Sequence, residues 1–165
     1  MTKRIRMAKD TKVRVFGGQV TLRFQDPTLD DWIKGIDHFT SGTKDFRPVF
    51  KIFGPYMIQS IKRNFDSEGR PQKWSALQPA TIRERIRLGY GAGPILHRTG
   101  DLARGFWFDY GPLSLQLSNY RKYFNPHQYG SRKRNIPKRP MIVIQSADKA
   151  YFTRLCRDHL LQEFG

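Results

Sequence analysis

Apolar and polar residues alternate in two parts of this 165-residue chain, and alternation with a period of two predicts half-buried strands. In residues 13–24 the alternation runs on both sides of a Gly-Gly pair, and glycine accepts the positive φ of a tight turn. This range therefore predicts a hairpin. Residues 106–110 and 113–117 alternate around a Gly-Pro pair and predict a second strand pair. The β-branched residues of 141–144 predict a further, buried strand.

Helical spacing appears elsewhere, and its longest run predicts the central helix of the core. Apolar residues recur every three or four positions from Phe46 to Phe65, and Asp45 precedes them as a cap. Gly54 and Pro55 fall inside this run. Because proline lacks the N–H of a helical hydrogen bond, we expect these two residues to kink or split the helix.

Shorter helices are predicted by the same rules of capping and spacing. They cover residues 26–39, 79–88, 99–102 and part of 119–129. Ser146 caps a final helix, whose expected inward residues are Tyr151, Leu155, Leu160 and Phe164.

These elements predict an α+β fold, with short antiparallel strands packed on one long helix and a C-terminal helix. A chain of this length can bury roughly 70% of its unfolded surface in one core, so residues 13–165 are expected to form a single domain. Residues 1–12 carry five basic side chains and few apolar ones, which predicts a basic N-terminal arm. The polar ranges 66–78 and 130–138 predict extended loops.

The net charge of +16, from 30 Lys and Arg against 14 Asp and Glu, favours an acidic partner. Nucleic acid, an acidic protein surface and an anionic membrane would all be attracted. The alternative is a basic surface that only keeps the protein soluble. No apolar run approaches the ~20 residues of a membrane span, so we expect a soluble protein without a signal peptide or a membrane partner.

Candidate catalytic and metal-binding residues do not form a recognisable set in the sequence. The four histidines lie in separate predicted elements without metal-ligand spacing, and Cys156 stands alone in a helical pattern typical of a buried residue. Asp101 follows Thr99 and Gly100 at a helix start, where a carboxylate is favoured by the free N–H groups. We therefore expect no catalytic residue, no metal and no cofactor.

Residues 119–139 hold seven basic side chains and no acidic one, with tyrosines and a phenylalanine interleaved. Lys and Arg on a loop can bind phosphates without reading bases, so this range indicates contact with DNA or with an acidic protein. The candidate contact residues are Arg132, Lys133, Arg134 and Lys138. A solvated loop remains the alternative.

Four segments, taken in order, resemble the bacteriophage virion-morphogenesis, or tail-completion, proteins. The segments are residues 65–77, 94–102, 127–130 and 136–141. They include Trp-Ser-Ala-Leu, Ile-Leu-His-Arg-Thr-Gly-Asp-Leu, His-Gln-Tyr-Gly and Ile-Pro-Lys-Arg-Pro. The resemblance spans residues 65–141, and it departs from the family pattern at Lys138, where a small residue is common. The N-terminal third has no counterpart in it.

This resemblance implies a non-enzymatic structural protein of the virion that completes or caps the tail and joins it to the head. Such a protein would form a homo-oligomeric ring, expected to be a hexamer, around packaged double-stranded DNA in the neck, beside other neck and tail proteins. It would be assembled in the host bacterial cytoplasm. The implied interface or loop-anchor residues are Trp74, Leu77, Thr99, Gly100, Leu102, His127, Gly130, Pro137, Arg139 and Pro140.

The charge alone supports a different hypothesis, a free sequence-independent DNA-binding protein or a nuclease-like enzyme. A ring protein should self-associate or join virion proteins. A free DNA-binding protein should remain monomeric or dimeric and bind duplex tightly at low salt.

Overall fold

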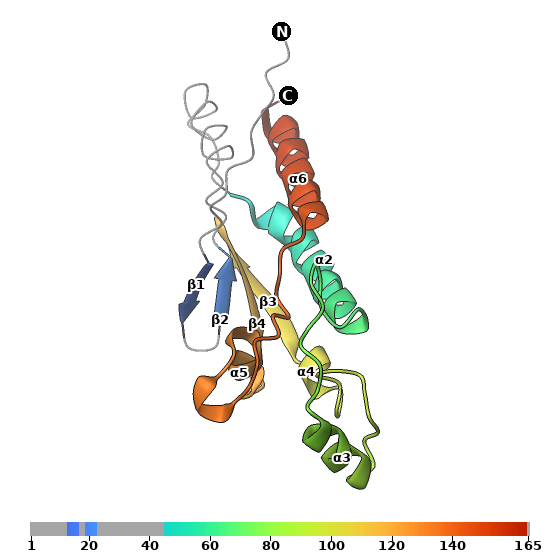
Figure 1. Cartoon of the computed structure of the whole chain (residues 1–165). Helices are drawn as coiled ribbons and strands as arrows, with labels where there is room; N and C mark the ends of the chain where they lie inside the picture. Colours follow the sequence, from blue (N-terminus) through green and yellow to red (C-terminus); the bar gives the residue numbers. More distant parts are fainter. Residues whose placement is uncertain (1–12, 17–18, 23–44, 165) are drawn as a thin grey trace.

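The computed structural model of the chain describes residues 13–16, 19–22 and 45–164 (Figure 1). The expected N-terminal arm and the helix expected over residues 26–39 lie outside these ranges. The described elements are helices and antiparallel strands, so the predicted α+β fold class is confirmed.

Both predicted strand pairs are present, and the structure joins them into one antiparallel sheet. The strands are β1 (Val13–Phe16), β2 (Gln19–Leu22), β3 (Phe106–Gly111) and β4 (Ser114–Asn119). Their order in the sheet is β1-β2-β4-β3. The two hairpins meet where β2 pairs with β4, with Val20 opposite Leu117.

The long helix α2 (Arg47–Asp66) packs against β3 and β4 and carries the centre of the core. Phe53 and Met57 of this helix are fully buried, as are Leu115 and Leu117 of β4. Alternate residues of β4 thus face α2, as the period of two predicts. Asp45 accepts a hydrogen bond from the backbone N–H of Arg47 at 3.0 Å, so it binds a free N–H of the first turn.

Of the two outcomes expected at Gly54 and Pro55, a kink or a split, the split is wrong, because α2 is continuous from Arg47 to Asp66. Pro55 lies on the exposed side of α2, where water can satisfy the carbonyl group that loses its helical partner. Gly54 faces the sheet instead. A Cβ atom there would lie 2.4 Å from the ring of Phe108, so glycine at this position permits close packing of helix and strand.

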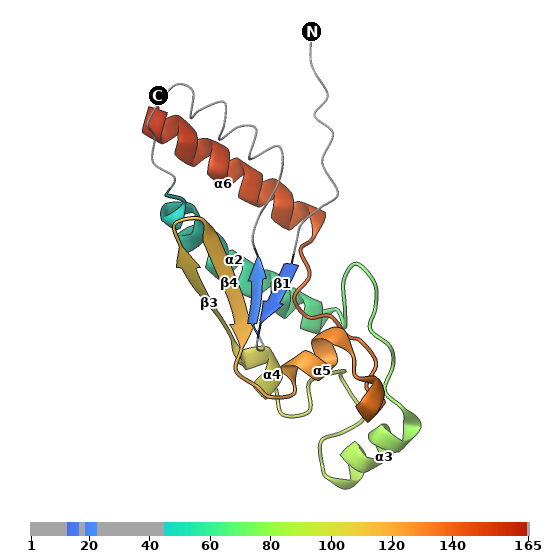
Figure 2. The ribbon, with the colours of Figure 1, turned by 90° about the vertical axis from the view of Figure 1, so that its left-hand side faces the viewer.

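The C-terminal helix α6 (Ser146–Phe164) packs along α2 (Figure 2). Its buried apolar side chains are Phe152, Cys156 and Leu160. Tyr151 and Leu155, expected to face inward, are half-buried and pack against the core, but their neighbours Phe152 and Cys156 lie deeper. Leu160 is inward as expected, and the side chain of Phe164 lies outside the described ones. Burial raises the pKa of the Cys156 thiol to about 12.

The strand predicted over residues 141–144 is wrong, although Met141 and Ile142 are buried. A side-chain amide replaces the missing strand partner. Gln128 Oε1 accepts the N–H groups of Met141 at 2.7 Å and Ile142 at 3.1 Å, and Gln128 Nε2 donates to the carbonyl of Ile142 at 3.0 Å. Asn64 Nδ2 donates to the carbonyl of Met141 at 2.7 Å. Buried backbone groups need partners, and here two amides supply them.

The short helices gather at the end of the molecule remote from the C-terminal end of α6 (Figures 1 and 2). They are α3 (Pro79–Arg87), α4 (Asp101–Arg104), α5 (Phe124–Tyr129) and the 3-10 helix η1 (Arg132–Arg134). None of the helices in the described ranges combines the length and apolar content needed to cross a membrane.

Candidate functional site

Trp74 joins the first of the four resemblance segments to the last. It is buried in a range that is otherwise largely polar, and its indole N–H donates to the carbonyl of Pro140 at 2.9 Å. The ring packs edge-on against Phe65, with centroids 5.4 Å apart. The loop that follows α2 is thus folded onto the core through one large side chain.

Arg139 fixes the same loop from the other side. Its guanidinium is buried and donates to the carbonyls of Ser75 at 2.8 Å and Ala76 at 3.0 Å. Its backbone N–H donates to the carbonyl of His127 at 2.7 Å. Burial lowers the pKa of Arg139. This arginine therefore holds backbone and is separated from the exposed basic residues beside it in the sequence.

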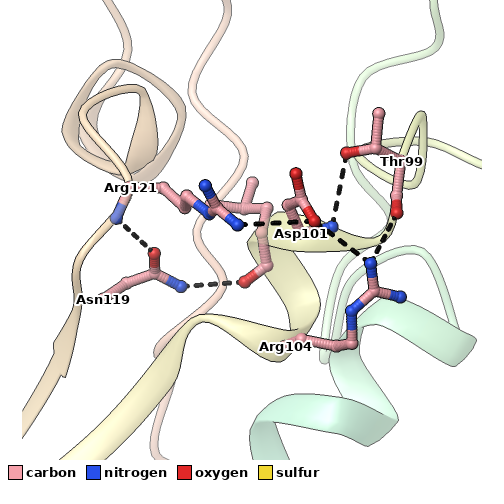
Figure 3. A network of polar contacts seen from close by, with 6 residues as sticks. Thr99, Asp101, Arg104, Asn119 and Arg121 are labelled. Atoms are coloured by element: carbon pink, nitrogen blue, oxygen red, sulfur yellow. Dashed lines mark hydrogen bonds and ion pairs between the residues drawn. The ribbon is translucent and has the colours of Figure 1, made fainter.

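The Thr-Gly-Asp-Leu segment forms a turn that leads into α4 (Figure 3). Gly100 has a φ of 75°, and a Cβ there would lie 2.7 Å from the guanidinium of Arg104. Thr99 Oγ1 accepts the backbone N–H of Asp101 at 3.4 Å. Arg104 donates to the Thr99 carbonyl at 2.9 Å and to the Asp101 carboxylate at 3.1 Å. The segment is thus closed on itself.

Asp101 connects this turn to the chain after β4. Arg121 lies 3.4 Å from its carboxylate, and Asn119 accepts the backbone N–H of Arg121 at 2.9 Å (Figure 3). Burial raises the pKa of Asp101, but the Thr99 hydroxyl and the two arginines outweigh this effect and leave that pKa below its ordinary value. Asn119 also donates to the carbonyl of Leu102 at 2.8 Å.

The predicted basic loop is closed at its base. The backbone groups of Ser131 and Ile136 exchange hydrogen bonds of 2.8 and 2.9 Å around η1, and Asn135 turns the chain with a φ of 51°. We call the four exposed basic side chains of this loop the basic cluster: Arg132, Lys133, Arg134 and Lys138. Within the part of the chain that the structure describes, none of the four makes an ion pair.

Comparison with known proteins assigns these segments to a family. The model of the phage virion morphogenesis family matches residues 25–161. The chain belongs to that family. It is also 26% identical over 114 residues to the putative capsid assembly protein G of Escherichia phage Mu, which covers 64% of this chain and 72% of the relative. No solved structure matches.

Membership of the phage virion morphogenesis family confirms the resemblance and supports a structural or assembly role in the phage virion. The matched range contains all four resemblance segments and begins after β1 and β2. Among the described residues, no group of three or more His, Cys, Asp and Glu side chains is placed to hold a metal ion.

The candidate residues of this family member fall into three classes of exposure. Trp74, Gly100, Leu102 and Arg139 are buried. Leu77, His127, Gly130 and Pro140 are half-buried. Thr99, Pro137 and the basic cluster are exposed. The structure brings Trp74 to Pro140 and Arg139 to His127, whereas the turn at Thr99 belongs to a separate set of contacts.

Sequence reasoning missed a buried polar network that joins α2, the following loop and α6. The Ser60 hydroxyl donates to the Asp148 carboxylate at 2.9 Å, and Arg70 donates to the Ser60 carbonyl and to Asn64 Oδ1, each at 2.7 Å. One feature of the sequence could have predicted this network. Ser60 and Asn64 lie at helical spacing from Met57 and Ile61, so they interrupt the apolar stripe on its buried face.

Proposed function

We propose that this chain is a non-enzymatic component of the phage neck, which completes the tail and joins it to the head as a ring around the DNA path. Family membership supports the virion role. The position around the DNA path rests on the basic cluster. Its four side chains are exposed and make no ion pair within the described structure, and two backbone hydrogen bonds close the loop that carries them. We infer that this cluster faces the DNA.

Phosphate contacts suit a channel through which DNA must move. Lys and Arg side chains displace counterions from phosphates without reading bases, so each register of the duplex is bound alike. The backbone of the loop is fixed while its charged side chains extend into solvent. In a ring, each subunit would repeat the cluster around the channel, and we propose six copies.

Labelling this protein on purified virions tests its position. We expect label at the junction of head and tail, and we expect phage that lack the protein to accumulate separate filled heads and tails. Label confined to another part of the particle would contradict the neck position. A pure protein that remains monomeric, binds duplex DNA tightly and is missing from virions would favour the free DNA-binding alternative.

The role of the basic cluster can be tested by replacing its four residues with glutamine. The fold should survive, because all four side chains are exposed. DNA retention should fall, and the salt dependence of DNA binding should lose a slope of roughly 0.9 for each phosphate contact removed. Four exposed basic residues elsewhere provide a control with the same loss of charge: Lys51, Lys62, Lys149 and Arg154.

Particles without DNA separate the two proposed partners of the basic cluster. If the cluster contacts DNA, the variant should join empty particles normally and fail only in filled ones. Failure in both kinds of particle would show that the cluster docks on an acidic neighbouring protein. Normal assembly in both would leave it as solvated surface and contradict the channel assignment.

A further inference from the structure

The segment from Leu77 to Arg98, which we call the α3 arm, projects from the sheet and the two long helices (Figures 1 and 2). The arm begins directly after Ala76, whose carbonyl accepts a hydrogen bond from the buried Arg139 guanidinium. Near its other end, the backbone N–H of Ile95 donates to the Glu68 carboxylate at 2.7 Å. Both ends of the arm are therefore attached to the region folded against the core.

The interior of the arm is fixed by a buried charge. The Arg85 side chain is 5% exposed, and its Nη1 donates to the carbonyl of Pro94 at 3.0 Å. Its Nε and Nη2 are buried and have no hydrogen-bond partner among the described residues. Burying a guanidinium with unsatisfied N–H groups costs free energy, which is offset only by what the folded arm gains elsewhere. The hydrogen bond from Arg85 ties α3 to the returning part of the arm at Pro94, and Ile95 and Leu96 then pack against the core.

Three large apolar side chains of the arm remain in solvent. Ile86 is 57% exposed, Leu88 is 41% exposed and Tyr90 is 40% exposed. These residues lie within five positions of one another at the end of α3. Single exposed apolar residues need no explanation, whereas three within five positions of a segment that is anchored at both ends favour an interaction site there.

The charge around these residues indicates the chemistry of the partner. Arg83, Arg87 and Arg98 are exposed, and none of them makes an ion pair in the described structure. The Arg98 guanidinium lies over the Tyr90 ring, 4.6 Å from its centroid, so an aromatic and a basic side chain already stand together on the arm. Glu84 is the one acidic residue in the sequence of the arm. A complementary surface would therefore be acidic at its rim and apolar where Ile86 and Leu88 enter.

A second copy of this chain is a poor candidate for a partner surface with an acidic rim. A second copy carries the same net charge of +16. Of its described carboxylates, Asp45, Asp101 and Asp158 are paired with arginines of the same chain and Asp148 is buried, which leaves the scattered residues Asp66, Glu84 and Asp109 exposed without an ion pair among the described residues. Duplex DNA would satisfy the arginines but would leave the apolar side chains in water. We propose that the α3 arm docks into an apolar groove with an acidic rim on a different virion protein. This inference rests on the proposed function, because it places the chain beside other neck or tail proteins.

The test uses tails and filled heads purified from phage that lack this protein, to which full-length variants are added. Ile86→Ser, Leu88→Ser and Tyr90→Ser together should reduce the amount bound at least about tenfold, because a few anchor residues carry most of the binding free energy of an interface. Ile52→Ser with Leu113→Ser is the matched control, since these side chains are 52% and 56% exposed outside the arm. The control should bind as the wild type does.

A second variant, Arg83→Glu with Arg87→Glu, tests the acidic rim. It should bind more weakly than wild type, and its binding should depend less on salt. Thermal melting and the oligomeric state of the pure protein should be unchanged in both arm variants. Wild-type binding by the triple variant, or loss of self-association in it, would overturn the arm proposal and leave the neck proposal standing. Failure of the wild type to bind either particle would overturn both.

Discussion

Two regions of this molecule are held together by different forces. Around α2, β4 and α6, apolar side chains at regular spacing pack against one another, and rings such as Phe50 and Phe152 stack with centroids 6.0 Å apart. In the four resemblance segments the backbone is largely irregular, and side chains hold it by hydrogen bonds. Gln128 and Arg139 each bind carbonyl groups of other segments.

The difference shows what the residues of the resemblance segments do in this fold. An irregular buried backbone must find partners for its N–H and C=O groups outside a helix or sheet. Trp74, Arg139 and Gln128 supply such partners. These residues fix the frame, whereas the basic cluster and the α3 arm are the surfaces that the frame presents.

Trp74→Ala should have the largest effect on the irregular region. Truncating a packed tryptophan costs about 3–5 kcal/mol, and the carbonyl of Pro140 also loses its donor. Denaturant unfolding measures the loss. Trp74→Phe retains most of the ring packing and removes the N–H, so it should cost less. If Trp74→Ala matched wild-type stability, the loop would not depend on this side chain.

Gln128→Leu should have an effect of similar size, because it leaves two N–H groups and one carbonyl buried without partners. Each such group costs about 1–3 kcal/mol. Gln128→Glu keeps the acceptor oxygen but loses the donor to Ile142, so it separates the two contributions. Hydrogen exchange at Met141 and Ile142 is the direct measurement. Unchanged protection of these amides in Gln128→Leu would refute the role of the amide as a strand substitute.

The regular region was predictable from the sequence because packing on one face of a helix or strand places apolar residues at a regular spacing. Alternation around Gly111 predicted β3 and β4, and the apolar run predicted α2. The pairing of β2 with β4 was not predictable, because it joins residues about a hundred positions apart. The deeper burial of Phe152 and Cys156 in α6 was not predictable either, because the apolar residues of this helix occur in adjacent pairs such as Tyr151 and Phe152.

The irregular region was recognised through family resemblance, but its physical roles were not readable. Apolar content at Met141 and Ile142 predicted burial correctly and a strand wrongly, because a distant glutamine amide supplies the partner. Likewise, Arg139 stands beside Lys138 in the sequence, yet one is buried and the other exposed. Spacing alone does not distinguish an arginine that holds backbone from one that meets a ligand.

Gly54→Ala tests the close packing of α2 against β3 in the regular region. The added methyl group would lie against the Phe108 ring, and overpacking of this kind costs about 1–3 kcal/mol. The neighbouring change, Pro55→Ala, lies on the exposed side of α2 and should not lower stability, since it restores a helical N–H. Thermal melting of the two variants compares them. A Gly54→Ala protein as stable as Pro55→Ala would mean that helix and sheet are not closely packed there.

The smallest expected effect is a pH dependence in the irregular region, centred on His127. Burial lowers the pKa of His127, and the nearby Arg139 charge lowers it further. The folded state therefore binds fewer protons than the unfolded state, whose histidine pKa is about 6.5. Stability from this residue is complete above the unfolded pKa and is lost progressively as the pH falls from there through the lower pKa of the folded state.

His127→Gln should accordingly reduce the loss of stability between about pH 7.5 and about pH 5, where an unperturbed histidine becomes charged. Melting temperatures at several pH values measure this change, and His97→Gln controls for loss of an exposed imidazole. The effect should be confined to the irregular region, so amide exchange near Arg139 should rise at acidic pH before exchange in α2 does. If both regions open together at acidic pH, the two parts of the fold unfold as one unit, and their different forces do not give them separate stabilities.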